Sequence, residues 1–322
     1  MTSIVTPVWR IGAAITLGLI ASLASAQTVG IGTTKSGATG QAASGVANIV
    51  SANSPVRMRP QPVEDTSKYL TDMDHGGLEF GVANHSQLAS AARGVGLSEG
   101  KPHPNLRMVA TLVPVWTGFY VRDASGIKTV AELRGKRIAG GFPAAPLPKF
   151  VTAGFLATAG LTYADVINVP MANFDAHWSA FEDGKTDAFV GALGSAVINR
   201  IEAATGRLRL LSFDKTPAAV TGLQSGVPAA EIVTLPQNPK LIGLAQGPVN
   251  VMQLHYTVSA NKDVSPDIVY QVTKAIYEND GKLVELAPMW SEFNRGLMTR
   301  DVGVEYHPGA VRLYREKGAW KR

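Results

Sequence analysis

The residues best suited to ligand chemistry lie in one short segment near the start of the chain. Residues 32–41 have the sequence Gly-Thr-Thr-Lys-Ser-Gly-Ala-Thr-Gly-Gln, between a short apolar stretch and a helix-like one. Glycines let the backbone approach a ligand closely, hydroxyl groups donate or accept hydrogen bonds, and the first N–H groups of a helix are free to bind. The segment therefore predicts a cradle for an anion or another polar ligand.

Nucleotide-binding motifs do not fit this segment. Ala38 stands where a P-loop has its phosphate-binding lysine, and Lys35 lies inside the loop instead. Gly30 and Gly32 lack the third glycine of a dinucleotide-binding fingerprint. We therefore expect neither ATP nor NAD, and no other cofactor.

Catalytic and metal sites are weakly indicated. The chain has no Cys, which excludes thiolate metal sites, cysteine nucleophiles and disulfides. It has no Gly-x-Ser-x-Gly motif, and its six His form no i, i+4 pair. We expect a protein that is neither an enzyme nor a metalloprotein; a periplasmic enzyme on the same scaffold is a minor alternative. His85 is still a candidate binding residue, because it follows a predicted strand.

Residues 1–26 have the features of a secretory signal peptide. Arg10 ends a short n-region, an apolar run follows from Ile11 to Ala24, and Ala24-Ser25-Ala26 is a small-residue cleavage site. The alternative is a membrane anchor, but the run is shorter than the roughly 20 residues that span a bilayer. We expect cleavage, export to the periplasm and a mature chain that does not span the membrane.

Length and charge limit which kinds of protein this chain can be. The chain has 322 residues, of which 45% are hydrophobic and 17% charged, enough for one large or two medium cores. The net charge is +5, and +4 without residues 1–26, which hold one Arg and no acid. Because the basic residues are scattered rather than gathered in a stripe, we do not expect nucleic-acid binding.

Repeated strand, polar loop and helix units predict two α/β lobes with ligands at the carboxyl ends of the strands. Pro114 is expected to separate two strands, and the prolines in 214–248 predict an irregular connection. Ser265-Pro266-Asp267 predicts a helix start. The main predicted strands are residues 28–32, 78–83, 106–113, 116–122, 136–139, 166–170, 188–190 and 249–260.

Four aromatic residues lie at expected loops or element starts, namely Trp116, Phe142, Phe174 and Trp178. Most aromatic side chains belong to a core. Trp116 and Phe142 are the stronger binding candidates, because one lies beside the expected crossing between lobes and the other follows a strand.

The order of these pieces resembles the TAXI-type solute receptors of tripartite ATP-independent periplasmic (TRAP) transporters. The resemblance spans nearly all of the mature chain and is most specific in residues 306–318, Tyr-His-Pro-Gly-Ala-Val-Arg-Leu-Tyr-Arg-Glu-Lys-Gly. Further matching segments are residues 33–44, 117–127, 133–138, 184–189 and 267–277. Leu-x-Gly-Lys-Arg and Gly-Lys-x-Asp-Ala are shared with other type II periplasmic binding proteins, so alone they indicate only the fold.

The resemblance implies a two-lobed type II periplasmic binding protein, each lobe a mixed, mainly parallel sheet flanked by helices. Residues 27–120 would begin lobe 1, residues 121–215 would form lobe 2, and residues 216–322 would hold the irregular connection, the return crossover strand and helices completing both lobes. Such a receptor captures a small organic solute, an organic anion or an amino acid, and delivers it to integral-membrane TRAP permease subunits. An importer driven by ATP (an ABC importer) is the alternative partner.

The resemblance also implies ligand contacts, although two segments depart from the family. Gly40-Gln41 replaces a Tyr pair, and residues 142–146, Phe-Pro-Ala-Ala-Pro, replace a Gly-Ser-Gly-Thr motif. The ligand therefore cannot be inherited; we expect an organic anion with Lys35 as charge partner and Phe142 as an apolar wall. The candidate binding residues are Thr33, Thr34, Lys35, Ser36, Thr39, Asn84, His85, Ser86, Trp116, Gly141, Phe142, Ala144, Ala145, Leu193 and Gly194.

Overall fold

The computed structural model describes residues 27–143 and 146–321. The expected signal peptide, residues 1–26, and the candidate binding residues Ala144 and Ala145 lie outside the described residues. Within the described ranges, no helix is both long and apolar enough to cross a membrane.

Strands and helices alternate along the chain, as the sequence predicts for an α/β protein. The strands are β1 (Gln27–Thr34), β2 (Val56–Val63), β3 (Phe80–Asn84), β4 (Leu106–Arg122), β5 (Arg137–Gly141), β6 (Ile167–Met171), β7 (Ala188–Ala192), β8 (Leu208–Leu210), β9 (Glu231–Leu235) and β10 (Val249–Asn261). The α-helices are α1 (Gly37–Asn53), α2 (Thr66–Asp74), α3 (His85–Arg93), α4 (Leu147–Ala157), α5 (Phe174–Glu182), α6 (Ala196–Thr205), α7 (Pro217–Gly226), α8 (Pro266–Glu278), α9 (Asp280–Leu286) and α10 (Pro308–Glu316).

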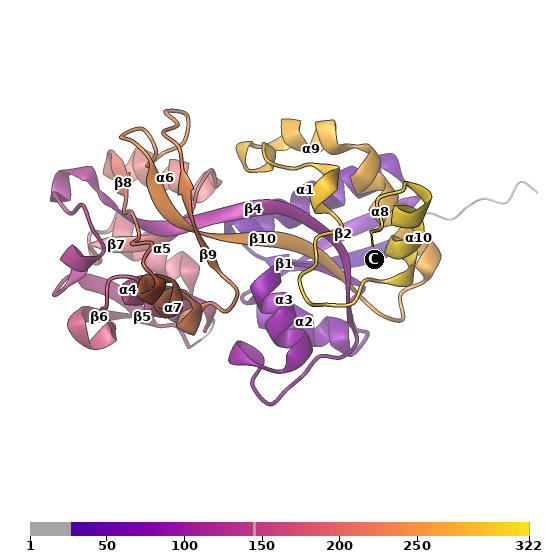
Figure 1. Ribbon diagram of the computed structural model, residues 1–322, viewed down its shortest axis with the longest axis horizontal. Coiled ribbons are helices and arrows are strands. Elements are labelled where there is room, and N and C mark those ends of the chain that lie inside the picture. Colours follow the sequence, from indigo (N-terminus) through magenta and orange to yellow (C-terminus); the bar gives the residue numbers. More distant parts are fainter. Residues whose placement is uncertain (1–26, 144–145, 322) are drawn as a thin grey trace, which may run out of the picture.

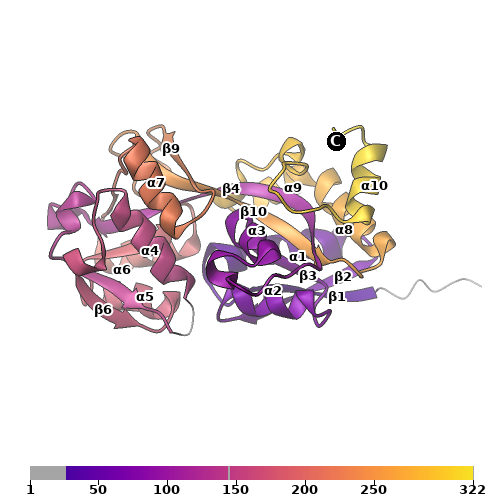
Figure 2. The ribbon, with the colours of Figure 1, turned by 60° about the horizontal axis from the view of Figure 1, so that its bottom comes forward.

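Two long strands, β4 and β10, pass through both halves of the molecule (Figures 1 and 2). The large sheet has the order β2-β1-β3-β10-β4-β7, with β8 also paired to β4 and β9 to β10. β1 is parallel to β2 and β3, whereas β10 is antiparallel to β3 and β4. A second, two-stranded parallel sheet joins β5 and β6. The expected mixed α/β architecture is confirmed.

Pro114 does not end a strand, which corrects the prediction of two separate strands. The pairing of β4 with β10 shifts between His255 and Thr257, where two residues of β4, Leu112 and Val113, lie opposite Tyr256 of β10. Pro114 lies at this irregularity, opposite His255. Since proline cannot donate a ladder hydrogen bond, a bulge is a position that tolerates it within a strand.

The buried side chains form separate cores in two lobes. We use lobe 1 for the part built around the first core, whose residues lie within 29–113 and 256–314. Lobe 2 has two adjoining cores within residues 119–254. Helices α1–α3 and α8–α10 surround the sheet of lobe 1, and α4–α7 lie in lobe 2 (Figure 2). The chain therefore passes between the lobes near residues 113–119 and 252–256.

The segment expected to be an irregular connection contains a helix and a strand. Thr216 caps α7 by accepting from the N–H of Ala219, and Pro217 takes the first helical position. Ala219 and Leu223 of α7 and Ile232 of β9 are buried in a core of lobe 2. The prolines here start and follow regular elements, so their density does not indicate an unstructured stretch.

Candidate ligand cavity between the lobes

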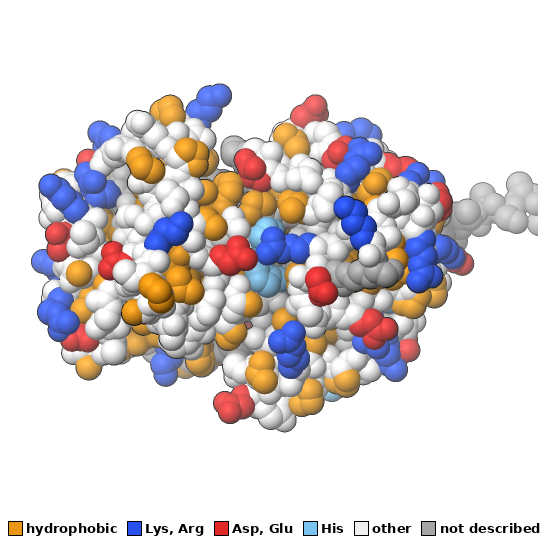
Figure 3. Space-filling model, viewed as in Figure 1, with side chains coloured by type: hydrophobic (Ala, Val, Ile, Leu, Met, Phe, Trp, Pro, Cys, Tyr) orange, Lys and Arg blue, Asp and Glu red, His pale blue; other side chains and the backbone are white. Residues whose placement is uncertain are grey.

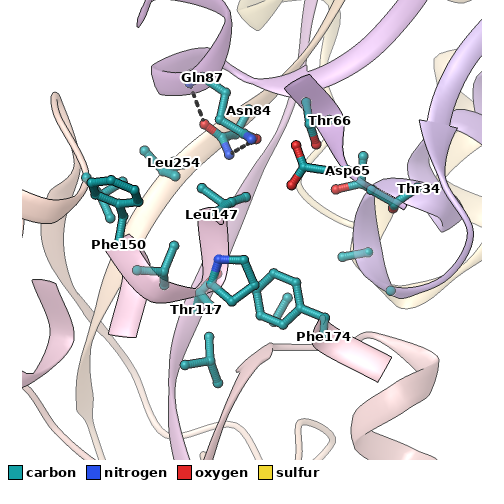
Figure 4. A pocket seen from close by; sticks show the side chains of 18 of the residues that line it. Thr34, Asp65, Thr66, Asn84, Gln87, Thr117, Leu147, Phe150, Phe174 and Leu254 are labelled. Carbon is teal, nitrogen blue, oxygen red and sulfur yellow. Dashed lines mark hydrogen bonds between the residues drawn. The ribbon is translucent and has the colours of Figure 1, made fainter. Parts of the chain in front are cut away.

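A cavity of about 210 Å³ lies between the two lobes (Figure 4). Drug-sized ligands occupy pockets of about 300–1,000 Å³, so this volume fits a smaller solute. Lobe 1 contributes the starts of α1, α2 and α3, and lobe 2 contributes the starts of α4 and α5, the end of β7 and the end of α7. The crossing strands β4 and β10 supply Thr117 and Leu254 between them.

Four helix caps converge on the cavity, because each helix follows the carboxyl end of a strand. Asp65, Asn84 and Asn173 accept hydrogen bonds from backbone N–H groups in the first turns of α2, α3 and α5. Ser36 caps α1 by position, but its hydroxyl makes no such bond. The cavity therefore has polar groups at the helix starts of both lobes.

Apolar side chains cover much of the remaining wall. Phe174 stacks on Trp178, with ring centroids 5.4 Å apart and an angle of 21° between the ring planes. Leu147 and Phe150 of α4 line the cavity together with Leu254 of β10 (Figure 4). The other described apolar residues in contact with the cavity are Ala38, Val63, Val115, Pro148, Val151, Val190, Ala192, Val227, Pro228 and Met252.

Lys35 lines the cavity but is paired within lobe 1. Its ammonium forms a short ion pair with Glu64, and the Lys35 side chain is 55% exposed. The hydrogen bond between them raises the pKa of Lys35 and lowers the pKa of Glu64. The expected charge partner of an organic anion is thus already neutralised by a neighbouring carboxylate.

Hydrogen bonds join the lobes around the cavity. The Ser36 hydroxyl donates to Oδ1 of Asp175 at 2.5 Å, and Nδ2 of Asn173 donates to Oε2 of Glu64 at 3.3 Å. The Ser86 hydroxyl donates to the carbonyl of Pro228. Each bond connects a lobe 1 residue to a lobe 2 residue, so all three depend on how close the lobes are.

Side chains also join the lobes where the crossing strands meet. The N–H of His255 donates to Nδ1 of His85, and Arg300 contacts both Nε2 of His255 at 3.4 Å and Oε1 of Glu231 at 3.3 Å. Figure 3 shows histidine, arginine and acidic side chains adjoining at this junction. Burial lowers the pKa of His255 to about 4 and also lowers the pKa of His85.

The structure brings together six of the predicted binding residues at the cavity and places seven other described ones away from it. Those that line it are Thr34, Lys35, Ser36, Thr39, Asn84 and Ser86. The described residues that do not line it are Thr33, His85, Trp116, Gly141, Phe142, Leu193 and Gly194.

Each departure has a structural reason. Thr33 is buried and its hydroxyl donates to the carbonyl of Thr39 at 3.2 Å. His85 accepts from β10, as described above, and Nε1 of Trp116 donates to Oε1 of Gln253 at 2.9 Å. His85 and Trp116 therefore support the junction between the lobes, and Thr33 supports the start of α1.

Phe142, the predicted apolar wall, does not line this cavity. Phe142 is 1% exposed and packs edge-on against His177, with ring centroids 6.0 Å apart. Gly141 precedes it at the end of β5 with a φ of 84°. Leu193 is buried in a core of lobe 2, and Gly194 follows it in a turn with a φ of 74°. These residues serve packing and chain reversal.

Several cavity residues were not predicted. Asp65 and Asn173 are of residue types that cap helices and stand just before predicted helices. Phe174 and Trp178 are aromatic residues at the start of an expected element. Gln87, Thr117, Leu147, Phe150, Leu254 and Tyr256 carried no local signal. Among the described residues, no group of three or more His, Asp or Glu could hold a metal ion.

Several solved structures are similar to this one in fold. The structure of PhnD1 from Prochlorococcus marinus in complex with methylphosphonate is similar in fold, at 12% identity over 91% of this chain and 99% of that chain, with a TM-score of 0.57. A structure described as a periplasmic transporter is 14% identical over 91% of this chain and 93% of that chain, with a TM-score of 0.56. The substrate binding protein of an amino acid ABC transporter gives a TM-score of 0.48 at 12% identity, over 82% and 98% of the two chains.

These identities are low, so the structural similarity shows the fold, which is that of two-lobed periplasmic binding proteins. The sequence also shows the family, because the model of the NMT1-like family matches residues 27–318. This match does not show the TAXI subtype that the sequence resembles. The chain belongs to the NMT1-like family.

Proposed function

We propose that this protein is an exported receptor that captures a small solute between its lobes and delivers it to a membrane importer. The observation that carries the proposal is the cavity itself, which both lobes line and two continuous strands cross. A protein of this shape binds by closing, since a solute that contacts both lobes favours the closed arrangement over the open one.

Binding without turnover is supported by the cavity's composition. The described residues in contact with it include Ser and Thr hydroxyls and three carboxylates, and none of them is His or Cys. The Ser36 hydroxyl donates to a carboxylate of the opposite lobe and has no imidazole beside it to act as a base. We therefore assign the polar groups to recognition.

Two kinds of importer are compatible with this role. The sequence resemblance pointed to a TRAP permease and left an ATP-driven importer as the alternative. Membership of the NMT1-like family gives no ground for placing the TRAP permease first, so we propose an importer of either kind. Crosslinking the receptor in membranes of its own cells distinguishes them, because it captures either a large multi-span permease or a permease with an ATPase subunit.

The receptor role is tested by purifying the exported chain under mild conditions and recording its mass in the native state. We expect a bound solute of low mass that unfolding releases. Thr117→Trp fills the cavity from the crossing strand and should abolish the adduct, whereas Ser98→Ala, outside the cavity, should retain it. An adduct that survives Thr117→Trp, or turnover of the solute, contradicts the proposal.

A further inference from the structure

The charges around the cavity do not match the organic anion that the sequence suggested. Among the described residues that line it, the cationic one is Lys35 and the anionic ones are Glu64, Asp65 and Asp175. Lys35 and Glu64 neutralise each other as an ion pair. Neither of the other two carboxylates forms a salt bridge with a described residue, although Asp175 lies near enough to Lys35 to help raise its pKa.

The carboxylate of Asp175 accepts a hydrogen bond from the opposite lobe. It accepts from the Ser36 hydroxyl at the start of α1, where the helix dipole favours a negative charge. The helix start that would otherwise attract an anionic ligand therefore already has a carboxylate beside it. An added anion would be repelled by Asp175 at that position.

Asp65 is different, because it is 5% exposed and its carboxylate points into the cavity (Figure 4). Its Oδ1 accepts from the N–H and the hydroxyl of Ser67, which is the capping role. No donor to its Oδ2 is found among the described residues. Among the described residues, Oδ2 of Asp65 is not one of the buried side-chain atoms that lack a partner, so it stays accessible from the cavity. A cationic N–H group is the strongest hydrogen-bond partner for such a carboxylate oxygen.

The surroundings of Asp65 match the rest of such a ligand. Leu147 of lobe 2 lies across the cavity from Asp65, and Phe174 presents its ring nearby (Figure 4). Aliphatic and aromatic walls bind an apolar body, and an aromatic face also attracts a cation. A cation held by Asp65 of lobe 1 and a body held by lobe 2 would join the lobes.

We infer that the solute is a protonated primary or secondary amine with a small apolar body, and that Asp65 binds its ammonium group. This inference rests on the proposed receptor function and specifies its ligand class. It differs from the expected organic anion in placing the recognised charge at Asp65 rather than at Lys35.

The test uses three probes of similar shape and different charge: 2-phenylethylamine, 2-phenylethanol and 3-phenylpropanoate. Their binding to the exported chain, freed of bound solute, is measured by calorimetry. We expect the amine to bind at least tenfold more tightly than the alcohol, and the carboxylate not to bind. Asp65→Asn should remove the preference for the amine while keeping the helix cap, since Asn caps helices as well as Asp does. Asp72→Asn removes the same charge from an exposed position of α2 and should change nothing.

The outcomes separate the two proposals. Failure of the amine to bind, tighter binding of the carboxylate, or an unchanged amine preference in Asp65→Asn overturns the inference. A co-purified solute that binds in the cavity but has no amine also overturns it and leaves the receptor function standing. If the purified chain carries no solute in the cavity at all, the receptor function itself fails.

Discussion

The hydrogen bond between Ser36 and Asp175 should contribute measurably to closing of the lobes. Its two partners lie on opposite lobes, 2.5 Å apart between the hydroxyl oxygen and Oδ1. A hydrogen bond to a charged group contributes about 1.5–3 kcal/mol when buried. Because Asp175 is exposed, we take about 1 kcal/mol, which corresponds to a change of about fivefold in an equilibrium constant. Ser36→Ala or Asp175→Ala should lower the ratio of closed to open receptor by that factor.

The assay uses the absence of cysteine in the chain. Lys101→Cys in lobe 1 and Asp214→Cys in lobe 2 place two dyes at exposed positions, and energy transfer between the dyes reports the closed fraction. A double-mutant cycle isolates the bond: the two alanine substitutions together should cost about as much as either one alone. Additive effects of the two substitutions, or closed fractions equal to that of the unsubstituted receptor, would refute the reasoning.

Three further substitutions test other parts of the structure. Gly37→Ala should reduce closing at least tenfold in the energy-transfer assay, because its φ is 76° and a Cβ would lie 2.9 Å from Trp178; unchanged closing contradicts this. Thr117→Trp should leave the thermal midpoint within a few degrees while abolishing solute binding, and retained binding places the site elsewhere. Burial lowers the pKa of His177 from 6.5 to about 3. Between these two pH values the unfolded chain binds a proton at this histidine that the folded chain does not bind. The free energy of unfolding therefore falls as the pH falls, by roughly 1.4 kcal/mol per pH unit. His177→Gln, which can still accept from the N–H of Val190, should make the decline in urea midpoint between pH 6.5 and 4 less steep, and an equal decline contradicts the assignment.

The alternation of strands and helices could be predicted because periodicity and caps are local. Ser265 and Pro266 start α8 as their sequence indicates. The same cap and proline arrangement at Thr216 and Pro217 starts α7. The density of prolines around it predicts an irregular connection instead, so the helix is not predicted. The sequence predicts a strand end at Pro114, because it does not show where the partner strand shifts its register.

The lobe 1 side of the cavity could also be predicted, since its polar residues directly follow strands. The lobe 2 side could not, because which faces of α4 and α7 meet lobe 1 depends on how the lobes are placed by β4 and β10. Phe142 shows the limit most clearly: an aromatic residue after a strand can face a ligand or a core, and here it packs on His177. Lys35 shows another, because its partner Glu64 lies 29 residues away in sequence.

The central claim is that one solute is held by both lobes at once. A crystal structure of the receptor purified with its own solute tests this most directly. We predict density for the solute in the cavity, in contact with Asp65 of lobe 1 and Phe174 of lobe 2. A solute bound outside the cavity, or contacting one lobe alone with the lobes apart, would contradict the account.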